Sequence, residues 1–166
     1  GGRVVDMISD DEGPFAPERS GGLPCFQLAE MATQDAVTFP EMMRRMQRKG
    51  GLMDWFGTSD AREIERRIHE GDGKAALVYE AMAHNLAKNI GKLAVVTRAR
   101  LDAILLTGGV ARSRMLTDWV AERVSFLAPV HVLPGENEME SLALGVLRVL
   151  RGEEEAHTFA ERTEAS

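Results

Sequence analysis

The sequence has little of several residue types, and each shortage excludes a class of protein. Cys25 is the only cysteine, which excludes an internal disulfide and a cysteine-based metal cluster. Aromatic residues make up only 5% of the 166 residues, so the core must be aliphatic. Such a core favours helices on a buried parallel sheet over a sandwich of antiparallel strands. The longest apolar runs, such as 103–106, are too short to span a membrane, and no signal-peptide pattern is present. We therefore expect a cytoplasmic protein.

The chain also lacks an excess of positive charge. Its net charge is −6, which argues against nucleic acid as the main partner. The basic pairs Arg44-Arg45 and Arg66-Arg67 are surrounded by acidic residues, so we interpret them as solvated helix faces. A hydrophobic content of 44% and a charged content of 28% are typical of a soluble globular protein.

The order of hydrophobic patterns predicts an α/β fold. A strand at 3–7 opens the chain, and a Gly- and Pro-rich loop follows at 9–24. Helices are predicted at 39–46, 61–69 and 73–97, with an apolar turn at 52–56. Strand, helix, strand and helix then alternate at 102–107, 113–126, 129–134 and 138–150, which implies a right-handed parallel crossover. The core face of the helix at 73–97 is predicted to carry Leu77, Val78, Met82, Leu86, Ile90 and Leu93. The core face of the helix at 138–150 is predicted to carry Leu142, Ala143, Val146, Leu147 and Leu150.

The segment Thr107-Gly108-Gly109-Val110-Ala111 lies where open α/β sheets bind ligands, at the carboxyl end of a buried strand. Two glycines let the backbone approach a ligand closely, and the next helix offers free N–H groups to phosphate or ribose oxygens. A tight turn without a ligand explains the same residues equally well. The pattern is neither a P-loop nor a dinucleotide fingerprint, because no Gly-Lys-Ser/Thr follows and the three spaced glycines are missing.

Three carboxylates, Glu136, Glu138 and Glu140, lie at the start of the last predicted helix. One or two carboxylates often bind Mg²⁺ together with water and phosphate oxygens. Acidic residues also stabilise a helix N-terminus without any metal, so this alternative stays open.

Arg19 lies in a loop that is stiffened by Pro14 and Pro17. A guanidinium held in one place suits the neutralisation of a transferring phosphoryl group. The alternative is a surface ion pair with Glu18 or Asp10. The segment 58–62 is, by its local pattern, a helix cap.

Several of these segments together resemble the C-terminal half of butyrate kinase, also called branched-chain carboxylic acid kinase, in the acetate kinase family. The matching blocks are Gly-Arg-Val-Val-Asp at 2–6, Glu-Gly-Pro-Phe-Ala-Pro-Glu-Arg-Ser-Gly-Gly-Leu-Pro at 12–24, Gly-Thr-Ser-Asp-Ala-Arg-Glu at 57–63, Leu-Leu-Thr-Gly-Gly-Val-Ala at 105–111 and Pro-Gly-Glu-Asn-Glu-Met-Glu at 134–140. The resemblance extends to about Gly152.

The resemblance implies a ribonuclease-H-like C-terminal domain of the acetate and sugar kinase, heat-shock 70 and actin superfamily. It implies that ATP and a short-chain carboxylate, such as butyrate or isobutyrate, give ADP and an acyl phosphate, with Mg²⁺ as cofactor. Site roles also follow from it. The residues matched to ATP binding are Asp60, Arg62, Thr107, Gly108, Gly109, Val110 and Ala111; Arg19 matches a catalytic arginine, and Glu138 matches a Mg²⁺-linked glutamate.

The resemblance further implies that residues 1–152 form the nucleotide-binding domain. The charged composition of 153–166 predicts a disordered tail. The family's N-terminal domain, with its catalytic histidine, and its His-x-Gly-Gly-Gly hairpin have no counterpart here. We therefore expect the chain alone to be inactive, and the complete enzyme to be a dimer or a larger homo-oligomer. Alternatives are a truncated or split-gene product, another kinase or ATPase of the superfamily, and a scaffold module that binds no nucleotide.

Overall fold

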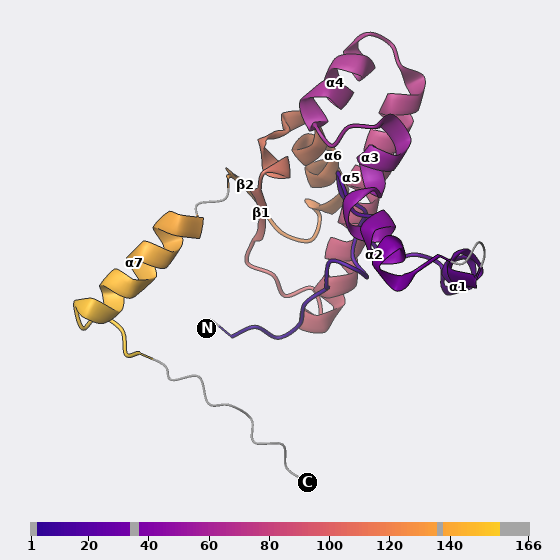
Figure 1. Cartoon of the computed structure of the whole chain (residues 1–166). Helices are drawn as coiled ribbons and strands as arrows, with labels where there is room; N and C mark the ends of the chain where they lie inside the picture. The colour runs from indigo at the N-terminus through magenta and orange to yellow at the C-terminus, as the bar shows by residue number, and fades with distance from the viewer. Residues whose placement is uncertain (1–2, 34–36, 136–137, 157–166) are drawn as a thin grey trace. The chain divides into compact units, whose positions relative to one another are not determined.

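The computed structural model describes residues 3–33, 37–135 and 138–156. They fall into two compact units, Gly1–Pro134 and Gly135–Ser166, and each is described by itself. The first unit contains, in chain order, α1 (Cys25–Thr33), α2 (Phe39–Arg48), α3 (Gly51–Phe56), α4 (Ala61–His69), α5 (Gly73–Ala94), η1 (Val95–Thr97), β1 (Ile104–Gly108), η2 (Val110–Arg112), α6 (Arg114–Val124) and β2 (Val130–Pro134) (Figure 1). The second unit contains α7 (Glu138–Leu150).

Side-chain caps start three of the helices. The carboxylates of Asp60 and Asp72 accept hydrogen bonds from the amides of Arg62 and Ala75, both over 3.0 Å, and so begin α4 and α5. The hydroxyl of Ser113 accepts from the amide of Leu116 over 3.0 Å and begins α6. These bonds satisfy amides that have no partner inside their own helix. The helix starts predicted at Ala61 and Gly73 are confirmed.

The strands β1 and β2 pair in parallel, with Ile104 opposite Val130 and Gly108 opposite Pro134. Helix α6 lies between them in the chain, which confirms the predicted parallel crossover. Along β1 the burial alternates. Ile104 and Leu106 are buried, whereas Leu105 is 61% exposed. The sequence predicts a buried strand at 102–107. The strand forms at Ile104–Gly108, but in the first unit only alternate residues of it are buried, because its other face is left uncovered by the described residues of that unit.

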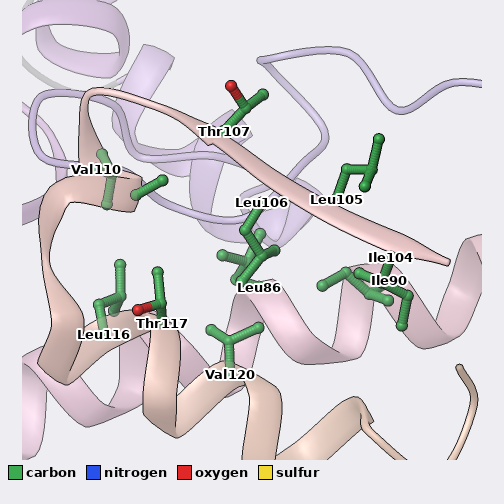
Figure 2. Close-up of a pocket in the computed structure, with 11 residues that line it drawn as sticks. Leu86, Ile90, Ile104, Leu105, Leu106, Thr107, Val110, Leu116, Thr117 and Val120 are labelled. Atoms are coloured by element: carbon green, nitrogen blue, oxygen red, sulfur yellow. The ribbon is translucent and has the colours of Figure 1, made fainter. Parts of the chain in front are cut away.

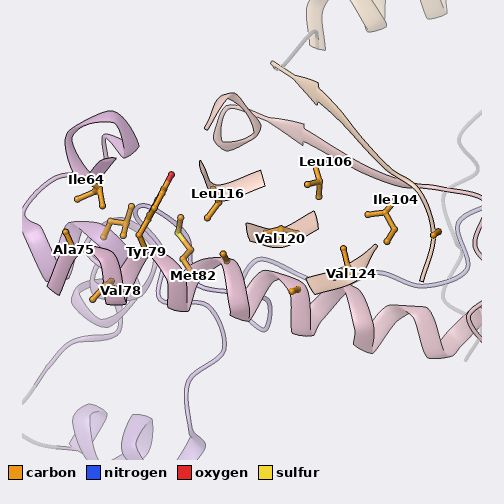
Figure 3. Close-up of a cluster of buried hydrophobic side chains, with 14 residues drawn as sticks. Ile64, Ala75, Val78, Tyr79, Met82, Ile104, Leu106, Leu116, Val120 and Val124 are labelled. Atoms are coloured by element: carbon orange, nitrogen blue, oxygen red, sulfur yellow. The ribbon is translucent and has the colours of Figure 1, made fainter. Parts of the chain in front are cut away.

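The core lies along α5 and is aliphatic, as the low aromatic content predicts. Figure 3 shows it extending from Ile64 and Tyr79 at one end of α5 to Ile104 and Val124 at the other. Its most completely buried large side chains are Tyr79, Leu52, Ile64, Val120 and Val124. Truncating one of the aliphatic ones to Ala is expected to cost about 2–5 kcal/mol, because a cavity remains. Helix α6 packs on α5 through this core.

The structure corrects three predictions in the first unit. Residues 3–7 are irregular rather than a strand, and Val4 and Val5 are exposed, since no neighbouring strand pairs with them in the described unit. Residues 52–56 belong to helix α3 rather than to a turn. Leu77 is 69% exposed, because Val78 and Tyr79 take the core-facing positions of that turn of α5.

Helix α7 agrees with the predicted range 138–150. The prediction that its apolar residues face inward is not confirmed, because Leu142, Val146 and Leu150 are 66%, 59% and 76% exposed. Among the described residues of this unit, α7 is the only helix or strand, so no other described element there buries that stripe. The predicted boundary at Gly152 stays a prediction, and residues 157–166 lie outside the described part of the chain. Among the described helices, none combines the length and the apolar character that crossing a membrane requires.

Candidate functional site

The loop that carries Arg19 is fixed by main-chain hydrogen bonds. The amides of Gly50 and Met53 donate to the carbonyls of Glu18 and Pro17 over 3.0 and 2.9 Å, and the amide of Ser20 donates to the carbonyl of Met46 over 2.8 Å. A further bond within the loop joins the amide of Ala16 to the carbonyl of Arg19 over 2.9 Å. The backbone of Arg19 is therefore held against the junction of α2 and α3, as the prolines and glycines of the loop suggest.

The side chain of Arg19 forms an ion pair with Asp10. Nη1 lies 3.2 Å from Oδ2 of Asp10, and the Arg19 side chain is 46% exposed. This is the surface ion pair considered from the sequence, with Asp10 rather than Glu18 as the partner. One contact engages one of the five N–H donors of a guanidinium, so the pair is compatible with a further anion at Arg19.

Asp60 and Arg62 form a local ion pair at the start of α4. Nη2 of Arg62 lies 2.7 Å from Oδ2 of Asp60, and Nε lies 2.9 Å from Oδ1. The hydrogen bonds from Arg62 lower the pKa of Asp60, and the carboxylate in turn raises the pKa of Arg62. The side chain of Arg62 is 90% exposed, so the pair leaves it accessible to a ligand.

The Thr107–Ala111 segment makes a sharp turn at the carboxyl end of β1. Gly108 has a φ of 87°, which favours glycine, whereas Gly109 has an ordinary φ of −62°. A Cβ placed on Gly108 would meet no atom within 4 Å, so open space lies above this backbone. Two main-chain hydrogen bonds close the turn. The amide of Arg112 donates to the carbonyl of Gly109 over 3.2 Å, and the amide of Ser113 donates to the carbonyl of Val110 over 3.0 Å.

A hydrophobic cavity of about 290 Å³ lies beneath the turn, between β1 and the helices α5 and α6. Figure 2 shows Leu106 on the side of the strand that faces Leu86, and Leu105 and Thr107 on the opposite side. The lining residues include no Lys or Arg, so the cavity has no cation to meet a phosphate. We regard it as an incompletely packed part of the core rather than as a phosphate site.

Two observations relate the segments that carry the predicted site residues. Arg19 and Ser59, the neighbour of Asp60, line one cavity of about 390 Å³. Ser113, two residues after the turn, accepts a hydrogen bond from Tyr79 and donates one to Glu65 of α4, over 2.9 and 2.5 Å. Helix α4, with Asp60 at its start, therefore connects the Arg19 loop to the Thr107–Ala111 turn. Sequence reasoning missed Glu65 and Tyr79, since their partners are distant in the chain.

The predicted metal ligand Glu138 cannot be placed. Its side chain, and residues 136–137, lie outside the described residues, and α7 belongs to the second unit. Within the described residues, no group of three His, Cys, Asp or Glu side chains is arranged to hold a metal. Mg²⁺ in phosphotransferases needs only one or two carboxylates beside phosphate oxygens, so the donor set fits the ion only if the nucleotide supplies the rest.

The sequence profile of the acetokinase family matches residues 11–138, which is most of the chain. The chain belongs to the acetokinase family. It is 46% identical over 155 residues to the probable butyrate kinase 2 of Caldanaerobacter subterraneus subsp. tengcongensis, covering 93% of this chain and 44% of the relative. It is 41% identical over 160 residues to butyrate kinase 2 of Clostridium acetobutylicum, and this match covers 95% of this chain and 45% of the relative.

Solved structures of this family have a similar fold. The acetate kinases of Porphyromonas gingivalis and Entamoeba histolytica each match with a TM-score of 0.70 at 21% identity, over 82% of this chain and 41% and 43% of theirs. At this identity the match shows the fold alone, and it confirms the predicted α/β fold of an acetate kinase domain. The chain spans less than half the length of the curated relatives that it matches.

Proposed function

We propose that this chain supplies the ATP-binding half of a carboxylate kinase that converts butyrate or isobutyrate to its acyl phosphate. The observation that carries the proposal is the open backbone at Gly108, at the carboxyl end of a parallel strand in a chain 41% and 46% identical to butyrate kinases. In open α/β sheets this is the edge where ligands bind. The Thr107–Ala111 turn would contact the nucleoside, and Asp60 and Arg62 the ribose and adenine.

In the proposed reaction a carboxylate oxygen attacks the γ-phosphorus of ATP. The bond between that phosphorus and the β–γ bridging oxygen breaks, ADP leaves with the electron pair, and an acyl phosphate forms. The carboxylate is already an anion at neutral pH, so the reaction needs positioning and charge stabilisation rather than a strong base. Arg19 would supply positive charge to the equatorial phosphoryl oxygens from its fixed loop.

Mg²⁺, carried by the phosphates, would supply further positive charge when bound, and we propose Glu138 as the residue of this chain nearest to it. We propose that the acid-binding residues lie in the part of the complete enzyme that corresponds to the portion of its relatives outside the match. We therefore propose that the chain alone forms no acyl phosphate. A cytoplasmic location and assembly into homo-oligomers are part of the same proposal and rest on the family resemblance.

A binding experiment tests the nucleotide half of the proposal. Isothermal calorimetry of the 166-residue chain should detect binding of ATP and of ADP. Gly108→Val should lower the affinity for both nucleotides, since the valine side chain would fill the space we assign to the nucleoside. Gly71→Val is the matched control, because Gly71 also has a positive φ, 91°, with no atom within 4 Å of a Cβ. Equal affinity of the two variants, or no heat from either nucleotide with the unaltered chain, would contradict the proposal.

An activity experiment tests the reaction. The chain is combined with the N-terminal half of the Clostridium acetobutylicum butyrate kinase 2, and acyl phosphate is trapped with hydroxylamine. We expect hydroxamate from butyrate and ATP with both halves present, and none from either half alone. Product from the chain alone would show that it holds a complete site, and transfer to a sugar instead of a carboxylate would indicate another kinase of the superfamily.

A further inference from the structure

Three side chains that are distant in the sequence form one hydrogen-bonded chain beside the turn. The hydroxyl of Tyr79 lies 2.9 Å from Oγ of Ser113 and 3.3 Å from Oε1 of Glu65. Oγ of Ser113 lies 2.5 Å from the same carboxylate oxygen. The proton order that satisfies all three groups is Tyr79 to Ser113 to Glu65, with the carboxylate as the final acceptor.

Each member of this group lies on a different element. Glu65 is in α4, Tyr79 is in α5, and Ser113 caps α6. Tyr79 is completely buried and makes an edge contact with Trp119, with the ring centroids 6.0 Å apart. Figure 3 shows its hydroxyl at the end of the core, away from the body of α5. A buried hydroxyl holds its partners in one geometry, because water cannot replace them without opening the core.

Ser113 connects this group to the turn. Its amide donates to the carbonyl of Val110 over 3.0 Å, while its hydroxyl accepts from the amide of Leu116 and from Tyr79. The position of Ser113 therefore fixes both the end of the Thr107–Ala111 segment and the first turn of α6.

Glu65 connects the same group to the start of α4. It lies five residues after Asp60 in a continuous helix, so the two positions are separated by about 7–8 Å along a rigid axis. The two segments that we assign to the nucleoside, 60–62 and 107–111, are thus joined through three side chains.

We propose that Glu65, Tyr79 and Ser113 are positioning residues that set the spacing between the Asp60–Arg62 segment and the Thr107–Ala111 turn. This inference rests on the proposed nucleotide site, and it adds that the affinity for adenosine nucleotides depends on side chains that do not touch the nucleotide. Cutting the link should loosen both segments together. The core should remain folded, because Tyr79→Phe keeps the ring and its packing.

The test uses the full 166-residue chain and ADP. Tyr79→Phe and Ser113→Ala should each raise the Kd for ADP by about fivefold or more, as expected for cutting a link between contacting groups. The double variant should bind ADP no more weakly than the weaker-binding single variant, since both substitutions break the same Tyr79–Ser113 hydrogen bond. Ser113→Thr keeps a hydroxyl and should bind as the unaltered chain does. Thr97→Val, which removes a hydroxyl that bonds only within its own helix end, is the matched control.

A second measurement needs no nucleotide. Amide hydrogen exchange at 57–62 and 107–112 should rise together in Tyr79→Phe and stay unchanged in Thr97→Val, with circular dichroism confirming that both are folded. An unchanged Kd, or exchange that rises only in the core, would overturn the inference while leaving the proposed function intact. Failure of the unaltered chain to bind ADP would contradict the proposed function, and the exchange result would still decide whether the three residues couple the two segments.

Discussion

The backbone of Gly51 packs directly against the carbonyl oxygen of Ala16. A Cβ added at Gly51 would overlap that oxygen and would lie 2.9 Å from the carbonyl oxygen of Arg19. Gly51 also has a φ of 60°, which side chains rarely adopt. This glycine therefore lets the Arg19 loop approach the start of α3, and the hydrogen bonds around Arg19 depend on that approach.

Gly51→Ala should be far more destabilising than its size suggests. Gly57→Ala is the matched control, because Gly57 also has a positive φ, 71°, but no atom lies within 4 Å of a Cβ there. We expect Gly57→Ala to cost about 1–2 kcal/mol from backbone strain alone. Gly51→Ala adds the overlap, so its urea midpoint should be lower and the backbone amides of 16–20 should lose protection. Equal midpoints would mean that the loop moves away at no cost.

Arg19 and Asp10 allow the two interpretations of the arginine to be separated. If Arg19 acts on the phosphoryl group, Arg19→Ala should lower kcat by about a hundredfold or more in the complemented enzyme, because it removes charge stabilisation of the transition state. Asp10→Asn should change kcat little, since it removes only an exposed ion pair. ADP affinity should remain close to normal in both. A normal kcat in Arg19→Ala would show that the ion pair is its whole role.

Asp60 has a capping role that must be separated from a role in binding. Asp60→Ala should lower the free energy of unfolding by about 1 kcal/mol, because the amide of Arg62 loses its acceptor. Asp60→Asn keeps an acceptor and should be nearly as stable as the unaltered chain. If the carboxylate contacts ribose, however, both variants should bind ADP more weakly. Retained affinity in a stable Asp60→Asn variant would limit Asp60 to the cap.

Arg62 provides a complementary measurement, since its exposed pair with Asp60 contributes little to stability. Arg62→Ala should change the free energy of unfolding by no more than about 0.5 kcal/mol, as for other surface substitutions. Its Kd for ADP should nevertheless rise if the guanidinium contacts the adenosine. Arg114→Ala is a suitable control, because Arg114 is similarly exposed and paired with Asp118. Equal affinity of the two variants would remove Arg62 from the site.

Local sequence signals predicted the parts of this structure that depend on neighbouring residues. The caps at Asp60 and Asp72 follow from an acidic side chain two or three residues before an amide that has no partner inside its helix. Such an interaction is local and does not depend on the rest of the fold. The Gly108 turn follows in the same way from two glycines after an apolar run. The strand predicted at 3–7 was wrong, since a β-pattern forms a strand only where another strand pairs with it.

The parts that could not be predicted depend on contacts between distant residues. Tyr79 and Ser113 are 34 positions apart, and Ser113 and Glu65 are 48 apart. In the sequence Tyr79 looks like one more apolar residue of a long helix, and Ser113 looks like an ordinary cap. Only the packing of α4, α5 and α6 brings their hydroxyls to one carboxylate, and no local pattern records that arrangement.

Tyr79 offers a direct test of that packing, because it is the only tyrosine in the chain. Burial raises its pKa to about 12 from an ordinary value of 10.0, and the nearby Glu65 carboxylate contributes in the same direction. The near-ultraviolet absorbance of the native chain should therefore show phenolate formation near pH 12, whereas the urea-unfolded chain should show it near pH 10. Tyr79→Phe should give no such signal in either condition.

The same shift predicts how stability changes with pH. The folded state favours the protonated phenol, so this contribution to stability is complete below pH 10 and is lost as pH rises through 10 towards 12. The urea midpoint of the unaltered chain should fall more steeply over this window than that of Tyr79→Phe, since other groups titrate equally in both. Parallel curves, or native phenolate formation near pH 10, would mean that the hydroxyl of Tyr79 is open to water and does not join α4 to the start of α6.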